Sequence, residues 1–177
     1  MTNTLSTNAL RRLEMQGWVG LDPAYLAEVH PWTRLAPALC MVVAAVGTAL
    51  ASPLILLALA VTAGAAAASG VHVFELFYNY GLRRINGTRP LPRARAARRF
   101  ACGAGAIWLA ATAALFIAGA DLPGYILGSA LVATSGAFTL TGFCIPSLIF
   151  NKLFGREAAC RASLVPQKMT VKGGISG

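Results

Sequence analysis

Four long apolar runs without a single Asp, Glu, Lys or Arg constrain what this chain can become. The runs cover about residues 35–51, 54–73, 100–120 and 125–150. A helix needs about 20 apolar residues to cross the hydrocarbon core of a bilayer, and each run approaches or exceeds that length. Very short turns, Ser52-Pro53 and Asp121-Leu122-Pro123-Gly124, join the first run to the second and the third to the fourth. We therefore predict an all-α integral membrane four-helix bundle made of two helical hairpins.

The composition argues against a water-soluble enzyme. Hydrophobic residues make up 56% of the 177 residues and charged residues only 12%, whereas soluble domains carry roughly 25% charged residues. Only six acids are present, which leaves little material for paired carboxylates or carboxylate metal clusters. Phosphate-binding loops, serine nucleophile elbows and His-Glu-x-x-His motifs are absent from the sequence. We expect no catalytic activity.

The fifteen basic residues predict the orientation, because Lys and Arg near span ends are retained on the cytoplasmic side. They lie before the first run, between the second and third, and after the fourth, and none lies in the two short turns. We expect a multi-pass protein of the bacterial inner membrane with both termini cytoplasmic. The middle segment carries arginines that we expect to contact anionic lipid headgroups or a partner protein. These are Arg83, Arg84, Arg89, Arg93, Arg95, Arg98 and Arg99. Without interleaved aromatic residues, they do not predict nucleic-acid binding.

The chain divides into three segments. They are a cytoplasmic or interfacial segment at 1–33, a four-span membrane domain at 34–155 and a cytoplasmic tail at 156–177. The first segment has no short apolar stretch behind a basic start, so we expect it not to be cleaved as a signal peptide. Within it, Asp22-Pro23 predicts the start of a short helix. Three aromatic residues are expected at the level of the lipid headgroups: Trp18, Tyr25 and Trp32.

A weak internal repeat relates the two hairpins at an offset of 72 residues. Residues 70–79 align with residues 142–151, matching Gly with Gly and Asn with Asn at the two ends. Because each half is a two-span hairpin, the halves would be parallel and related by an axis along the membrane normal. A chance match between two helices rich in Ala and Leu is the alternative. The alignment places His72 opposite Cys144.

His72 is a candidate cofactor ligand, since an ionisable residue within a span is a functional hypothesis by default. On a continuous helix, Ala68 would leave a flat surface one turn earlier, against which haem or bacteriochlorophyll could lie. That spacing resembles light-harvesting polypeptides. The interpretation that we favour keeps His72 near the interface, hydrogen-bonded to a neighbouring carbonyl group or to Glu75, and predicts no cofactor.

The cysteines are candidates for a metal site. Cys40, Cys102 and Cys144 all fall near the predicted cytoplasmic ends of spans, so with His72 they could surround one metal. Metal sites usually contain close ligand pairs such as Cys-x-x-Cys, and this sequence has none. We expect these three residues to be small hydrophobic side chains rather than metal ligands, and Cys160 to be a free thiol.

Small residues recur at every fourth position in the second and fourth runs, which allows helices to approach closely in lipid. They are Ala60, Gly64 and Ala68, and Ser129, Ala133 and Ala137. We predict that these two faces meet at the centre of the bundle. Near the end of the fourth run, Pro146 should kink the helix or leave the carbonyl group of Gly142 without its helical partner.

Three stretches resemble an uncharacterised family of small four-span bacterial membrane proteins, known only as a domain of unknown function. The stretches are residues 72–84, residues 98–102 and residues 143–155, and the resemblance covers about residues 30–155. Members of that family often have a second cysteine three residues after the first at the end of the last span. Ser147 takes that place here, which puts any thiol chemistry of such a pair in doubt. The resemblance implies the architecture and no activity.

Three classes of function follow from these features. We predict a non-catalytic accessory or structural subunit of a larger membrane complex, respiratory or photosynthetic, that contacts other membrane subunits and lipid. A haem- or bacteriochlorophyll-binding protein that uses His72 is the first alternative. A small transporter is the second, disfavoured because the spans offer few polar side chains to line a path.

Overall fold

The computed structural model describes residues 21–91 and 94–161, together with residues 6, 8, 9, 12, 13, 16 and 18. All the regular secondary structure in these residues is helical, which confirms the predicted all-α class. The elements are α2 (Pro23–Val29), η1 (Trp32–Arg34), α3 (Leu35–Ala49), α4 (Pro53–Ser69), α5 (Val73–Phe77), η2 (Tyr78–Leu82), α6 (Arg83–Asn86), α7 (Ala96–Ile117), α8 (Asp121–Thr141) and α9 (Ile145–Arg161).

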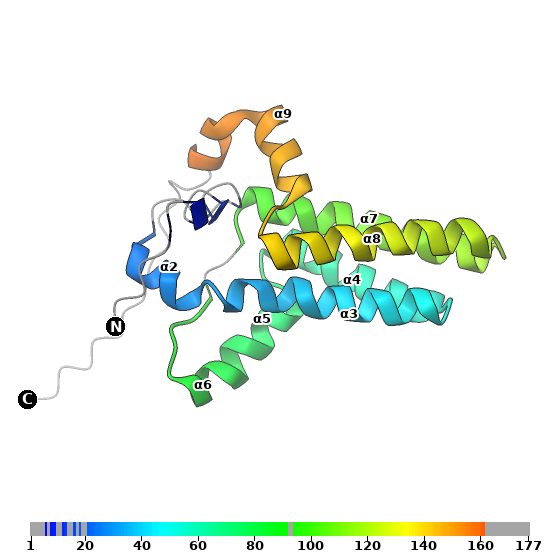
Figure 1. Cartoon of the computed structure of the whole chain (residues 1–177), viewed down its shortest axis with the longest axis horizontal. Helices are drawn as coiled ribbons and strands as arrows, with labels where there is room; N and C mark the ends of the chain where they lie inside the picture. Colours follow the sequence, from blue (N-terminus) through cyan, green and yellow to red (C-terminus); the bar gives the residue numbers. More distant parts are fainter. Residues whose placement is uncertain are drawn as a thin grey trace, which may run out of the picture.

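Helices α3, α4, α7 and α8 lie side by side and form a bundle (Figure 1). Within the described part of the chain, three helical segments are long and apolar enough to cross a membrane: Trp32–Ala49, α7 and α8. A fourth span results if α4 and the helical segment Val73–Asn86, which are bent by 77° relative to each other, are counted together. Helix length and hydropathy thus identify a multi-pass membrane protein.

The two hairpin turns lie at the same end of the bundle (Figure 1). The first turn covers residues 50–52, and Pro53 begins α4, where its missing N–H is not needed. The second turn was expected at residues 121–124 but lies at residues 118–120, and Asp121 is already the first residue of α8. An acid and a proline both suit the first turn of a helix, so the polar sequence there begins the helix instead of separating two helices.

The second and fourth predicted spans end earlier than expected, and they end alike. Helix α4 stops before Gly70 (φ 74°) and α8 stops before Gly142 (φ 71°), both in the left-handed conformation that ends helices. A new helix begins three residues after each glycine, at Val73 and Ile145. The break therefore recurs at the positions that the internal repeat aligned.

Basic side chains cap the ends of both broken helices. The guanidinium group of Arg99 donates to the carbonyl oxygens of Ala67 (2.7 Å) and Ala68 (2.6 Å) at the end of α4. At the end of α8, the guanidinium groups of Arg12 and Arg34 donate to carbonyl oxygens of residues 139–141. Positive charge at a helix C-terminus complements the helix dipole, so these arginines stabilise the places where the spans stop.

The predicted effect of Pro146 is confirmed at Gly142. Four residues before the proline, the carbonyl oxygen of Gly142 accepts a hydrogen bond from Nε2 of Gln16 at 2.9 Å instead of a helical one. Proline has no N–H to donate there. The N-terminal segment thus satisfies a backbone group that the proline leaves open.

The predicted packing of the second span against the fourth is wrong. Helix α4 packs chiefly against α7, and α8 packs chiefly against α3. Ala60 is buried, but four of the other residues are exposed: Ala68, Ser129, Ala133 and Ala137. A Cβ atom placed on Gly64 would lie 4.0 Å from the Cβ of Ala106 in α7. Small residues occur on more than one face of these helices, so their spacing alone does not determine which face packs.

The segment before the bundle is partly as predicted. Asp22 caps α2, its Oδ1 accepting a hydrogen bond from the backbone N–H of Ala24 at 3.2 Å. Trp18 does not face headgroups, because it is buried against Leu13 and Leu26. At the other end, α9 runs to Arg161, across the boundary predicted at residue 155. The rest of the predicted tail, residues 162–177, lies outside the described residues.

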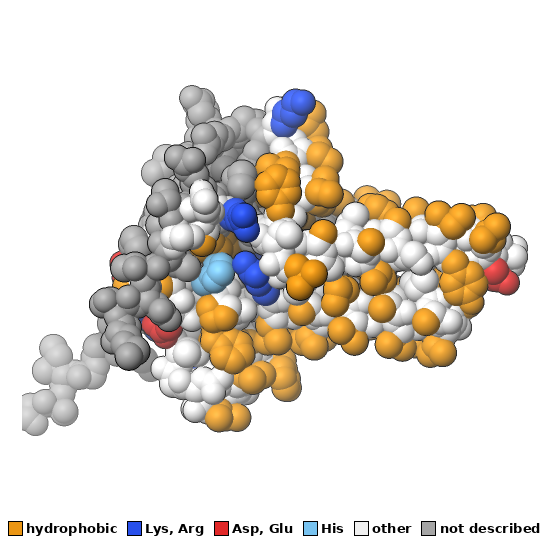
Figure 2. Space-filling view, viewed as in Figure 1, with side chains coloured by type: hydrophobic (Ala, Val, Ile, Leu, Met, Phe, Trp, Pro, Cys, Tyr) orange, Lys and Arg blue, Asp and Glu red, His pale blue; other side chains and the backbone are white. Residues whose placement is uncertain are grey.

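The surface separates by chemical type along the bundle. On the face drawn in Figure 2, hydrophobic side chains cover the length of the bundle. Basic side chains on that face gather at the end away from the hairpin turns, where acidic ones are also visible, and the tip with the turns carries an acidic side chain and no basic one. This arrangement is the three-dimensional form of the charge asymmetry seen in the sequence.

Candidate functional site

A cavity of about 590 Å³ lies inside the bundle, toward the end away from the hairpin turns. All four bundle helices line it, together with the start of α5 and of α9. Its walls are mainly apolar, with Phe100, Trp108 and Phe138 as the aromatic side chains and many alanines between them. The cavity is the first candidate for a functional site, since ligand sites are concave, mostly apolar and carry a few polar groups.

Small residues on facing helices create this space. Ala63 and Ala66 of α4 and Ala104 and Gly105 of α7 contribute only short side chains, or none, to the cavity wall. A Cβ atom added to Gly105 would have no neighbouring atom within 4 Å. The position of Gly105 therefore faces open space, which a larger side chain could occupy.

His72 forms part of the polar edge of the cavity. It is buried, and it is the N-cap of α5, where Nδ1 accepts a hydrogen bond from the backbone N–H of Phe74 at 3.4 Å. A neutral imidazole whose Nδ1 accepts must carry its proton on Nε2. Nε2 lies 3.4 Å from Sγ of Cys40, so the ring donates to the sulfur. In this tautomer His72 does not act as a base toward the thiol of Cys40.

The expected surface for a macrocycle beside His72 does not exist. Helix α4 ends at Ser69, and His72 lies after the left-handed Gly70, so Ala68 is not one helical turn below the imidazole ring. Both ring nitrogens already have protein partners. The favoured alternative of a hydrogen-bonded histidine agrees with this geometry, although the ring contacts Cys40, and Glu75 binds only its backbone N–H.

A buried ion pair lies next to His72. The guanidinium group of Arg98, from α7, is 2.6 Å from Oε1 of Glu75, from α5. The other carboxylate oxygen of Glu75 accepts the backbone N–H of His72 at 3.1 Å. Arg98 also reaches the carbonyl oxygen of Thr33 at 3.4 Å and lies over the ring of Trp18. One ion pair therefore joins α5, α7 and the N-terminal segment at the edge of the cavity.

Three cysteines that fall near the same ends of the predicted spans lie on the cavity wall. Cys40, Cys102 and Cys144 come from different helices or helix ends, and all three are free thiols. Among the described residues, no group of three or more His, Cys, Asp or Glu side chains is placed to hold a metal ion. The structure brings these residues and His72 to one cavity without building a metal site. The side chain of Cys160 lies outside the described residues.

Several arginines predicted to contact lipid bind the protein itself. Arg98 is buried in its pair with Glu75, and Arg99 caps α4. Arg89 pairs with Glu28 at 2.7 Å on the surface, and this contact lowers the pKa of Glu28. The lipid prediction is therefore wrong for Arg98, whose side chain is only 13% exposed. It stays a prediction for Arg83, Arg84, Arg93 and Arg95, of which Arg93 lies outside the described residues.

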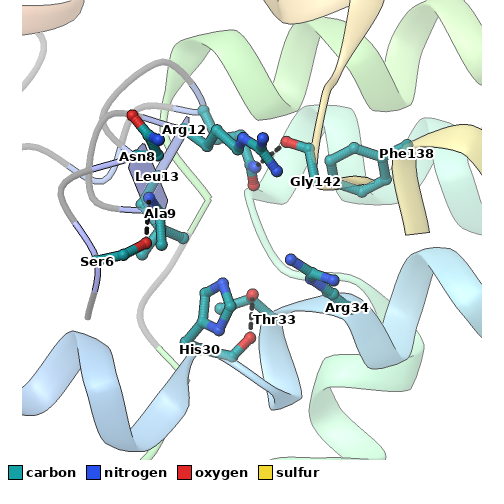
Figure 3. A pocket seen from close by; sticks show the side chains of 11 residues that line it. Ser6, Asn8, Ala9, Arg12, Leu13, His30, Thr33, Arg34, Phe138 and Gly142 are labelled. Carbon is teal, nitrogen blue, oxygen red and sulfur yellow. Dashed lines mark hydrogen bonds between the residues drawn. The ribbon is translucent and has the colours of Figure 1, made fainter. Parts of the chain in front are cut away.

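A second, smaller pocket of about 270 Å³ lies where the N-terminal segment meets α8 (Figure 3). Arg12, Arg34 and His30 line it. Both arginines already donate to carbonyl groups at the end of α8. Burial and the nearby charge of Arg34 lower the pKa of His30, which favours its neutral form. The arginines of this pocket thus stabilise the C-terminal end of α8, and we do not assign the pocket a ligand.

Sequence reasoning missed the partnership of Arg98 with Glu75 and the role of Gln16. One signal was available for the first: Glu75 lies two residues beyond the predicted second span, and a carboxylate that is buried there requires a cationic partner. No comparable signal exists for Gln16, because a polar residue in a polar segment does not indicate which carbonyl group it will reach.

The family model for Domain of unknown function (DUF4395) matches residues 30–154. The chain belongs to this family. The extent agrees with the resemblance seen at about residues 30–155, and all the residues that line the larger cavity fall inside the matched range. No curated protein and no solved structure matches the chain.

Proposed function

We propose that the chain is a non-catalytic membrane accessory subunit that binds an apolar molecule in the cavity of its bundle. The volume of about 590 Å³ carries this proposal, because it falls within the roughly 300–1,000 Å³ typical of small-molecule sites. The walls suit a hydrocarbon or aromatic body. The edge formed by His72 and by the pair of Glu75 and Arg98 suits a polar group at one end. The ligand class is therefore an amphiphile from the bilayer.

The chemistry of the polar edge supports binding rather than catalysis. Activation of a thiol requires a base that accepts its proton, whereas His72 donates to the sulfur of Cys40. Glu75 and Arg98 satisfy each other and the neighbouring backbone. These groups can orient a polar headgroup, and no nucleophile and base among them form a working pair.

Analysis of the bound molecule tests the proposal. The full chain would be purified in mild detergent and extracted with organic solvent, and the extract analysed by mass spectrometry. Gly105→Phe should fill the cavity, since the position faces open space. Ala111→Phe is the matched control, exposed on the same helix and away from the cavity. We expect a bound amphiphile with the parent and the control and its loss with Gly105→Phe. Equal recovery from all three would contradict the proposal.

The accessory role has a separate test, because a binding protein need not be a subunit. The basic segments and the long apolar surface give the chain contacts for other membrane proteins. Gentle extraction should recover the chain in a complex with a defined set of other membrane polypeptides, identified by mass spectrometry. Recovery of the chain alone, at the mass of a monomer or homo-oligomer, would contradict the accessory role and leave ligand binding unaffected.

A further inference from the structure

The helical segment Val73–Asn86 has an apolar face that none of the described residues covers. It leaves α4 at 77°, so it does not continue along the bundle (Figure 1). Glu75 and Tyr78 on its inner face are buried, whereas Phe77 is 63%, Tyr80 71% and Ile85 84% exposed. Phe77 and Tyr80 are three residues apart and so are neighbours on one face of the segment, and this face points away from the protein.

Helix α9 repeats the arrangement on the other side of the bundle. It follows the break at Gly142 and leaves the same end of the bundle as Val73–Asn86, in the opposite direction (Figure 1). Leu153 and Phe154 of α9 are 69% and 57% exposed, whereas Ile145 and Ile149 nearer its start line the cavity. Two helices therefore extend sideways from one end of the membrane bundle, each with large exposed apolar side chains.

Basic residues accompany both faces. Arg84 lies in the exposed part of the first segment with Arg83 beside it, and Lys152 is exposed in α9. Among the described residues of Val73–Asn86, the only acid is Glu75, which is buried and paired. The exposed surface of that segment is therefore apolar and cationic, the combination that anionic membrane interfaces bind.

We propose that Val73–Asn86 and the first turns of α9 lie in the plane of the membrane interface and bind anionic phospholipid headgroups. The apolar side chains would enter the acyl boundary by about 5–10 Å, and the basic side chains would contact the phosphates. Because the segment turns away from the axis of α4 by 77°, it does not extend that helix in a straight line across the membrane. This assignment holds whether or not the cavity binds a ligand.

Photocrosslinking tests the assignment in the full chain. A photoreactive benzophenone amino acid would be placed at Phe77 and at Leu153. Ile107, exposed in the middle of α7, is the lipid-facing control, and Phe116, buried in the core on the same helix, is the control without access to lipid. After illumination in native membranes, mass spectrometry would identify the adducts. We expect phospholipid adducts at positions 77, 153 and 107 and none at position 116. Adducts of 77 and 153 with another polypeptide, or no adducts there, would overturn the proposal.

The headgroup preference has its own test. The chain with the photoreactive residue at position 77 would be placed in vesicles of equimolar phosphatidylcholine and phosphatidylglycerol, with and without Arg83→Gln and Arg84→Gln. We expect phosphatidylglycerol to exceed half of the lipid adducts in the first protein and to fall to half in the second. An equal share of both lipids in the protein that keeps its arginines would overturn the anionic preference.

Discussion

At the scale of single residues, the ion pair of Glu75 and Arg98 is the most consequential contact of the site. Both side chains are largely buried, and the pair connects two helices that are separate in the sequence. Burying two charges is expensive, and the attraction between them offsets this only while both are present. The sequence could indicate that Glu75 needs a cation, but with seven arginines in the same segment it could not say which one.

Removal of one charge from this pair should destabilise the protein strongly. For Glu75→Gln we expect a loss of about 3–5 kcal/mol, because Arg98 would remain buried without its counter-charge. The matched control is Glu28→Gln at the exposed pair with Arg89, where we expect a much smaller loss because solvent screens the two charges. Thermal unfolding in detergent, followed by circular dichroism, measures both. Equal effects of the two substitutions would show that the pair of Glu75 and Arg98 is not effectively buried.

At the scale of elements, the positions where helices end could be predicted better from the sequence than the contacts between helices. The break after α8 follows from Pro146 and Gly142, which act within one stretch of chain. The contact of α8 with α3 depends on Gly128, where a Cβ atom would lie 2.5 Å from the side chain of Thr48. Many other small residues in α8 have the same local character. The spacing of small residues along one helix therefore does not predict which distant helix it contacts.

The close approach at Gly128 should be sensitive to added volume. Gly128→Val would force α3 and α8 apart, and we expect a loss of about 1–3 kcal/mol from overpacking. Ala133→Leu on the exposed face of α8 should change stability by less than about 0.5 kcal/mol. Thermal unfolding in detergent compares the two. If Ala133→Leu were the more damaging, the originally predicted face would be the packed one.

At the scale of the whole molecule, the hairpins and the separation of charge were both predictable, because hydropathy and basic residues are properties of the linear sequence. The cavity was not. It arises where Gly105 and several alanines from helices far apart in the chain face one another, and alanines are common throughout the spans. The sequence indicates only that four residues of its wall fall near the same ends of the spans: Cys40, Cys102, Cys144 and His72.

The orientation of the whole bundle remains a prediction: the hairpin turns on the outer side and the broken helix ends on the cytoplasmic side. Single cysteines at Asp121, in the first turn of α8, and at Asn86, at the end of α6, report the two sides. In sealed right-side-out vesicles, a charged maleimide should label position 121 above the background of the parent and should not label position 86. The reverse pattern would invert the orientation.

The central claim is that the bundle cavity binds an apolar amphiphile, and fluorescence of Trp108 in the cavity wall tests it most directly. The full chain in lipid nanodiscs would be titrated with a dibrominated fatty acid, whose bromine atoms quench only nearby indole rings. We predict saturable quenching in the parent, loss of the saturable part in Trp108→Phe, and its loss in Gly105→Phe, where Trp108 remains but the cavity is filled. Quenching that rises without saturation and equally in all three proteins would contradict a binding site in the cavity.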